Sequence, residues 1–121
     1  MKTSRRMLLA LLALLLLAGC VTWLVSHRKS FDPAVWRNRA TSDSVRLQMA
    51  DDLVRNHKLK GLTKVEVVTL LGQPPQTPYF KAYDLVYYLG PERGFMSIDS
   101  EWLIVKLGAD GRVAEAKIGR D

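Results

Sequence analysis

The N-terminal segment most constrains what the rest of the chain can fold into. Three basic residues within positions 2–6 precede an apolar run at 7–17, and two small residues then lead to the only cysteine, Cys20. A charged start, an apolar stretch and small residues before a cleavage point are typical of a secretory signal peptide. Residues 1–19 are therefore predicted to be a signal peptide, which leaves one small domain in a chain of 121 residues.

The end of this segment, Leu17-Ala18-Gly19-Cys20, resembles the bacterial lipobox. In a lipobox the cysteine sulfur receives a diacylglycerol, and the chain is cleaved on the N-terminal side of that cysteine. We therefore expect lipidation at Cys20, with covalent diacylglycerol and acyl chains as attached groups and no cofactor. Several acyl chains give stable membrane anchoring. A lipidated Cys20 leaves no thiol for a disulfide, so the domain must be stabilised by packing alone.

An uncleaved transmembrane anchor at 7–25 is the alternative. The residues after Cys20 stay apolar up to Val25, and the run is close to the roughly 20 residues that a spanning helix needs. Basic residues flank both ends, so the positive-inside rule does not choose an orientation. Either way the domain is predicted to be held at a membrane of the bacterial envelope, facing the periplasm. Val21, in place of an aspartate after the cysteine, favours the outer over the inner membrane.

The charge of the chain is mildly basic. The formal net charge is +6, and three of the basic residues lie in the predicted signal peptide. The remaining basic residues are scattered, whereas nucleic-acid binding needs a clustered basic face with aromatic residues for stacking. We therefore expect a membrane and an envelope protein as partners, and no nucleic acid.

A tether is predicted to join the anchor to the domain. Residues 20–41 comprise the lipidated cysteine and this tether, and the domain covers 42–121. Asp32 suits the N-cap of a short helix or turn that has Pro33 at its first position. The polar stretch also contains three large apolar residues, which are expected to dock on the domain: Phe31, Val35 and Trp36.

Two amphipathic helices are predicted at the start of the domain. A cap at Ser42-Asp43-Ser44 precedes the helix 43–57, whose apolar residues recur at helical spacing: Val45, Met49 and Leu53. Thr63 and Glu66 match a capping box for a second, short helix, and Gly72 ends it.

Three strands are predicted to follow. Aromatic and β-branched residues are frequent at 83–89, 101–107 and 112–118, and turn signals at Gly90-Pro91 and Asp110-Gly111 mark the breaks. Helices on one face of an antiparallel meander make a two-layer α+β domain. The predicted fold class is therefore α+β, with two helices packed on a three-stranded sheet.

The same segments resemble the SmpA/OmlA (BamE-like) family of small outer-membrane lipoproteins. The resemblance rests on the lipobox, on Gly61-Leu62-Thr63 and Leu71-Gly72-Gln73-Pro74, on Tyr87-Tyr88, and on Asp110-Gly111-Arg112-Val113. It implies two helices on a three-stranded antiparallel sheet, an architecture that β-lactamase-inhibitor-like domains share. It also implies an accessory role in outer-membrane protein assembly or envelope integrity.

The sequence contains no pattern typical of an active site. Neither His27 nor His57 has the spacing of a metal ligand, and no histidine lies near Ser97 or Ser100 to activate it. Asp51 and Asp52 diverge by about 100° on a helix. We therefore expect a chain that is not an enzyme and has no metal site.

Strand alternation predicts a partner-binding face. One face of the sheet is expected to include Tyr83, Leu85, Tyr87 and Leu89. The other is expected to contain Val86, Tyr88, Trp102 and Ile104. Helices cover only one face, so the second would be an apolar binding surface bordered by Tyr79, Phe80 and Phe95. In the competing expectation, Phe31, Val35 and Trp36 fold back over it.

The predicted function is that of a membrane-anchored, non-enzymatic protein-binding module of the envelope. In the alternative, the domain is a periplasmic inhibitor or sensor that captures an enzyme or a peptide on the same sheet face.

Overall fold

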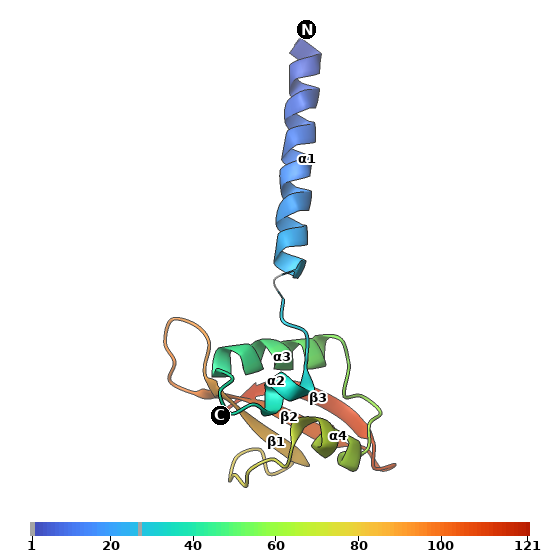
Figure 1. Ribbon diagram of the computed structural model, residues 1–121, viewed down its shortest axis with the longest axis vertical. Helices are drawn as coiled ribbons and strands as arrows, with labels where there is room; N and C mark the ends of the chain where they lie inside the picture. The colour runs from blue at the N-terminus through green and yellow to red at the C-terminus, as the bar shows by residue number, and fades with distance from the viewer. Residues whose placement is uncertain (1, 27) are drawn as a thin grey trace.

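The computed structural model describes residues 2–26 and 28–121, with side chains described for 4–24 and 28–121. One long helix, α1 (Lys2–Ser26), extends away from a small folded domain (Figure 1). The domain has the remaining described elements: α2 (Pro33–Arg37), α3 (Asp43–Arg55), α4 (Lys64–Leu71), β1 (Leu85–Pro91), β2 (Ser100–Leu107) and β3 (Val113–Arg120). The strands form one antiparallel sheet in the order β1-β2-β3, so the predicted α+β class is confirmed.

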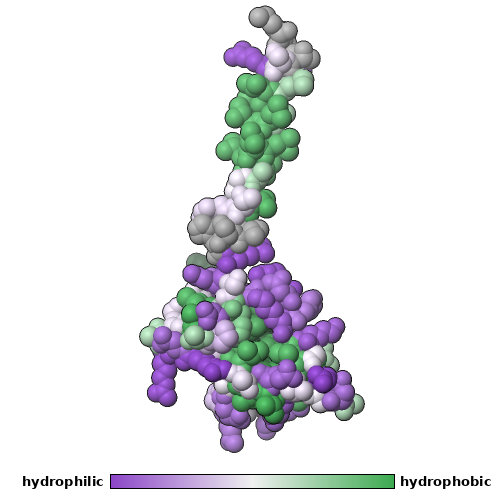
Figure 2. Space-filling model, turned by 45° about the vertical axis from the view of Figure 1, so that its right-hand side comes forward, coloured by the Kyte–Doolittle hydropathy of each residue, from purple (hydrophilic) through white to green (hydrophobic). Residues whose placement is uncertain are grey.

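The α1 helix is apolar and exposed. Ser4–Leu24 is long and apolar enough to cross a membrane, and each of its side chains is exposed. Figure 2 shows this helix as an apolar column above a domain whose visible surface is largely hydrophilic. Cys20 lies on it and is exposed. An N-terminal apolar helix of this kind fits a signal peptide or a membrane anchor.

Local capping signals explain where the helices of the domain begin. The Ser42 hydroxyl accepts a hydrogen bond from the Val45 N–H at 3.3 Å, which starts α3. Thr63 and Glu66 form the predicted capping box at the start of α4. The α3 helix ends at Arg55, two residues before the predicted end, because His57 has a φ of 50° and leaves the helical conformation.

The first strand lies two residues later in the chain than predicted. Tyr83 belongs to a turn, in which its N–H donates to the Phe80 carbonyl at 2.9 Å, so pairing begins at Leu85. Gly90 does not end the strand. The register shifts between Tyr88 and Gly90, and pairing then continues to Pro91. This shift is a β-bulge, which adds a residue without ending the ladder.

Gly90 is also where β1 and α3 approach each other closely. Its φ is 136°, and a Cβ added there would lie 2.8 Å from the Asp43 Cβ. A side chain would therefore be strained by the backbone and would clash with the first residue of α3.

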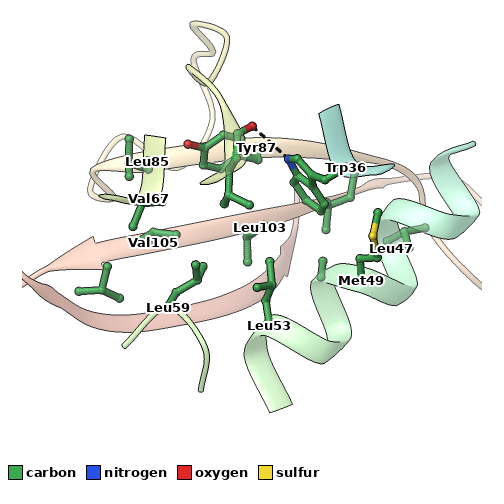
Figure 3. Close-up of a cluster of buried hydrophobic side chains, with 14 residues drawn as sticks. Trp36, Leu47, Met49, Leu53, Leu59, Val67, Leu85, Tyr87, Leu103 and Val105 are labelled. Carbon is green, nitrogen blue, oxygen red and sulfur yellow. Dashed lines mark hydrogen bonds between the residues drawn. The ribbon is translucent and has the colours of Figure 1, made fainter. Parts of the chain in front are cut away.

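The main core lies between the helices and one face of the sheet, here called the inner face. Figure 3 shows Trp36, Leu53, Tyr87 and Leu103 converging from four elements. The Trp36 indole N–H donates to the Leu71 carbonyl at 3.0 Å, and the Tyr87 hydroxyl donates to the Gly72 carbonyl at 2.8 Å. Burial raises the pKa of Tyr87 to about 12. These bonds join α2 and β1 to the end of α4.

Two of the three apolar tether residues dock on the domain, as expected. Trp36 is buried in the main core, and Phe31 packs against it with ring centroids 5.9 Å apart, whereas Val35 is exposed. The competing expectation, that these residues cover the second sheet face, is wrong. The α2 helix packs against α4, so Trp36 enters the inner side.

Candidate functional site: the outer face of the sheet

The face opposite the main core, here called the outer face, has its own small apolar cluster. Val86, Trp102 and Ile104 are buried in it, and Phe80 and Tyr83 pack against them. The loop before β1 therefore covers the middle of the predicted binding face. The alternation prediction is confirmed for the strand residues, and it is wrong for Tyr83. That residue precedes the strand, so the two-residue period does not apply to it.

Aromatic rings gather around Trp102. Its ring centroid lies 5.1 Å from Tyr88, 5.6 Å from Tyr79 and 6.3 Å from Phe80. Trp102 itself is buried, while Tyr79 and Tyr88 are 50 % and 45 % exposed. We call Trp102 and the three residues around it, Tyr79, Phe80 and Tyr88, the aromatic patch. Tilted and edge-to-face rings at such distances attract each other beyond the effect of burial.

The buried tryptophan is held by the end of the chain. Its indole N–H donates to the Asp121 carboxylate at 2.9 Å. The same carboxylate accepts the Ser100 N–H at 3.1 Å. The Trp102 ring is thus fixed in orientation, and the exposed tyrosines rest on a rigid base.

Phe80 occupies a strained position within the aromatic patch. Its φ is 54°, a left-handed conformation that costs an L-residue about 1–2 kcal/mol. A Cβ added at Gly119 would lie 3.2 Å from the Phe80 ring and 3.1 Å from Ile104. The missing side chain on β3 therefore leaves room for the Phe80 ring on the sheet. Strain of this kind collects at functional sites.

Charged side chains lie beyond Ile104 on the same face. Lys117 Nζ lies 5.5 Å from the Tyr83 ring centroid, and Lys106 Nζ lies 6.0 Å from it. A hydrogen bond with Tyr83, and then one with Glu115, raises the pKa of Lys117. The outer face thus passes from an aromatic end to a predominantly basic end.

Phe95 does not join the aromatic patch. It lies in the loop between β1 and β2, beyond the Pro91–Ser100 pair, and it is fully exposed. The other predicted site residues come together around Trp102. Cys20 is separate from all of them, on α1.

Asp51 and Asp52, the two acidic residues considered for chemistry, are engaged in ion pairs, and so is Glu101. Asp51 binds Arg93 at 2.6 Å, and Asp52 binds Lys58 at 2.5 Å. Glu101 is only 2 % exposed and lies between Arg93 and Arg120, at 2.8 and 3.4 Å. Across residues 2–26 and 28–121, no group of three or more His, Cys, Asp or Glu side chains could hold a metal ion.

Sequence reasoning missed the ionic cluster around Glu101. Asp51, Arg93 and Arg120 lie on different elements, and each looks like an ordinary surface charge in the sequence. The one available signal was Glu101 itself, a charged residue at the start of an apolar strand, where burial demands a partner.

No protein-family model, curated protein or solved structure matches this chain.

Proposed function

We propose that the chain is a membrane-anchored, non-enzymatic protein of the bacterial envelope, and that its aromatic patch binds a protein partner. The α1 segment, or lipid on Cys20, attaches it to the membrane with the domain in the periplasm. The outer membrane and an accessory role in outer-membrane protein assembly or envelope integrity are the setting that the lipobox and the family resemblance favour.

The observation that carries the proposal is the exposure of Tyr79 and Tyr88 around a buried, fixed Trp102. Tyrosine and tryptophan are enriched at protein interfaces because they offer a large apolar area together with a polar group. Rigid aromatic side chains also lose little conformational freedom on binding. Lys106 and Lys117 nearby favour a partner with an apolar centre and an acidic edge.

The test is photo-crosslinking at Tyr88 in the full-length protein, in its native membranes. We expect one envelope protein to be crosslinked in the parent chain and to be lost in a Tyr79→Ser variant. Val65→Ser is the matched control, because Val65 is an exposed apolar residue on α4 rather than on the outer face. Trp102 is unsuitable for substitution, since its removal would disturb the buried cluster.

The identity of the crosslinked protein separates the functional alternatives. A subunit of the outer-membrane assembly machinery supports the accessory role. A single periplasmic enzyme in its place supports the inhibitor or sensor function. Crosslinking that is equal in the Tyr79→Ser variant contradicts the aromatic patch as the binding site.

Anchoring is tested separately with Cys20→Ser and metabolic labelling by palmitate. Labelling that disappears in the variant supports lipidation. An unlabelled parent chain that stays in the membrane supports the uncleaved helix instead, and a parent chain that leaves the membrane contradicts both forms of anchoring.

A further inference from the structure

The loop between β1 and β2 displays a second, separate set of apolar side chains. Phe95, Met96 and Ile98 are 103 %, 62 % and 77 % exposed. We call these three residues the apolar tip. Among residues 28–121 the other exposed large apolar side chains are Val35, Val65, Tyr79 and Tyr88, and only Val65, at 74 %, is as exposed as the tip. Val35 and Val65 lie on separate helices, and the two tyrosines belong to the aromatic patch. A concentration of apolar residues in water indicates a binding surface.

The base of this loop is held by several interactions. The Glu92 N–H donates to the Asp99 carbonyl at 2.8 Å, and the Ser97 hydroxyl donates to the Glu92 carbonyl at 2.7 Å. Arg93 pairs with Asp51 on α3 and with Glu101 on β2. The Glu92 carboxylate binds Arg120 on β3 at 2.8 Å. We call Glu92, Arg93 and Asp99, with the partners just named, the neck of the loop. The apolar tip is therefore presented on a fixed neck, which lowers the entropy lost on binding.

The charges around the tip suit an apolar environment. Residues 94–98 contain no charged side chain. At the base of the loop Glu92 pairs with Arg120, and Arg93 pairs with Asp51 and Glu101; the bonds to Asp51 raise the pKa of Arg93 above its usual value. Asp99, which follows the tip, is exposed. Insertion of residues 95–98 alone, with Asp99 left among the polar headgroups, would therefore bury no charge, and burial of an unpaired charge is the main cost of such insertion.

The position of the loop indicates what the tip meets. In Figure 1 the loop rises beside α3 toward the end of the molecule from which α1 extends. Asp43 and Leu47 of α3 line one hollow together with Arg93 and Ser97 of the loop, so the loop and α3 are neighbours. The apolar tip is thus on the side of the domain that faces the apolar helix.

The tether keeps that side close to the membrane. The Phe31 N–H donates to Asp52 on α3 at 2.7 Å, which fixes the middle of the tether to the domain. The chain between Leu24 and Phe31 spans at most about 25 Å when fully extended. A bilayer that holds α1 is therefore always within reach of the domain, at a high effective concentration.

We propose that the apolar tip inserts into the interfacial region of the bilayer that holds the N-terminal segment. The domain then has two membrane contacts, and the outer face of the sheet keeps a defined orientation to the membrane plane. The inference shares only the membrane attachment with the proposed function and does not depend on the aromatic patch or its partner.

The test uses the full chain with Cys20→Ser and Met96→Cys, labelled at position 96 with an environment-sensitive fluorophore. The protein is reconstituted through α1 into vesicles of phosphatidylethanolamine and phosphatidylglycerol. We expect a blue-shifted emission that is lost when spin-labelled lipids are added. The matched control is the label at Ala109→Cys, in the exposed turn between β2 and β3 at the other end of the sheet, and its emission should be unchanged.

A second pair of variants keeps the test specific. With Phe95→Ser and Ile98→Ser the label at position 96 should return to a water-like emission, while Val65→Ser should leave the emission blue-shifted and still quenched by spin-labelled lipids. All three side chains are exposed, so these substitutions leave the core intact. A water-like emission of the parent label in vesicles overturns the proposal. So does a label that shifts only when envelope proteins are added, because the tip would then bind a protein.

Discussion

At the scale of single residues, Asp52 joins the tether to the domain. Its carboxylate accepts hydrogen bonds from the Phe31 N–H, the Asn56 amide and the Lys58 ammonium group, at 2.7, 2.6 and 2.5 Å. Burial by itself would raise the pKa of Asp52. The hydrogen bonds, led by the one from Lys58, lower it by more, so the pKa lies below its usual value.

We predict that the Asp52 carboxylate makes the free energy of unfolding fall as the pH is lowered. A group whose pKa is lower in the folded state stabilises the fold above its unfolded pKa, about 3.9, and the stabilisation is lost as pH falls through the folded pKa. Asp52→Asn should lower the free energy of unfolding at pH 7 by about 1–3 kcal/mol. Its stability should then fall less between pH 7 and pH 3 than that of the parent chain, as measured by urea unfolding.

Asp99→Asn is the control for this prediction, because Asp99 is exposed. It should leave both the stability at pH 7 and the acid dependence close to those of the parent. An equal loss on acidification in the parent and in Asp52→Asn would contradict the role of Asp52.

At the same scale, Gly119 leaves room for the Phe80 ring. We predict that Gly119→Ala pushes this ring off the sheet, with an overpacking cost of about 1–3 kcal/mol. The environment of Trp102 should change with it, as seen in the near-ultraviolet circular dichroism. The double variant with Phe80→Leu should recover part of the lost stability, since fewer side-chain atoms then meet the new methyl group. No recovery would contradict this account.

At the scale of elements, α2 acts as a strap: it packs across the end of α4 and holds it through Trp36. It has only five residues, which is too short for a stable helix alone, so packing of Trp36 keeps it in place. The same residue gives α4 a partner for the Leu71 carbonyl.

Trp36→Ala is therefore predicted to cost about 3–5 kcal/mol, and Trp36→Phe less, because a smaller ring keeps part of the contacts while the hydrogen bond is lost. Amide exchange at the end of α4 should rise in both variants. Val35→Ala, an exposed position on the same helix, should change stability by less than about 0.5 kcal/mol. Equal effects at positions 35 and 36 would show that α2 does not act as a strap.

The neck of the β1–β2 loop is held in place by ion pairs to Glu101. Glu101 is buried between two arginines, and removing one partner of a buried ion pair is more costly than removing an exposed one. We predict that Glu101→Ala costs about 3 kcal/mol or somewhat less, because the arginines are partly exposed. Amide exchange in residues 93–98 should rise as well.

Glu115→Gln serves as the comparison. Glu115 pairs with Lys117 at 3.3 Å on the surface, where such pairs contribute about 0–1 kcal/mol. A loss at Glu101 no larger than at Glu115 would contradict the importance of the neck.

At the scale of the whole molecule, the apolar N-terminal helix and the domain are separate parts. Every described side chain of Ser4–Leu24 is exposed, and the main core contains none of them. We predict that a chain of residues 28–121 folds with a free energy of unfolding within about 0.5 kcal/mol of the full chain in detergent. Urea unfolding followed by near-ultraviolet circular dichroism measures this difference, and an unfolded short chain would contradict it.

The sequence by itself determined the elements that depend on neighbouring residues. The N-terminal apolar segment, the caps at Ser42 and Thr63, and the alternation along β2 are local signals. The caps and the alternation predicted their elements to within about two residues, whereas α1 begins at Lys2, five residues before the predicted anchor at 7–25. Alternation also placed Tyr88 and Trp102 on one face, so the centre of the candidate site was predictable before the fold was known.

Only the tertiary structure decided how distant segments meet. It placed Trp36 in the inner core rather than over the outer face, and it put Phe80 and Tyr83 on the outer face instead. It also joined Asp51 to Arg93 across 42 positions of the chain. These contacts depend on the three-dimensional path of the loops, and no local pattern in the sequence encodes that path.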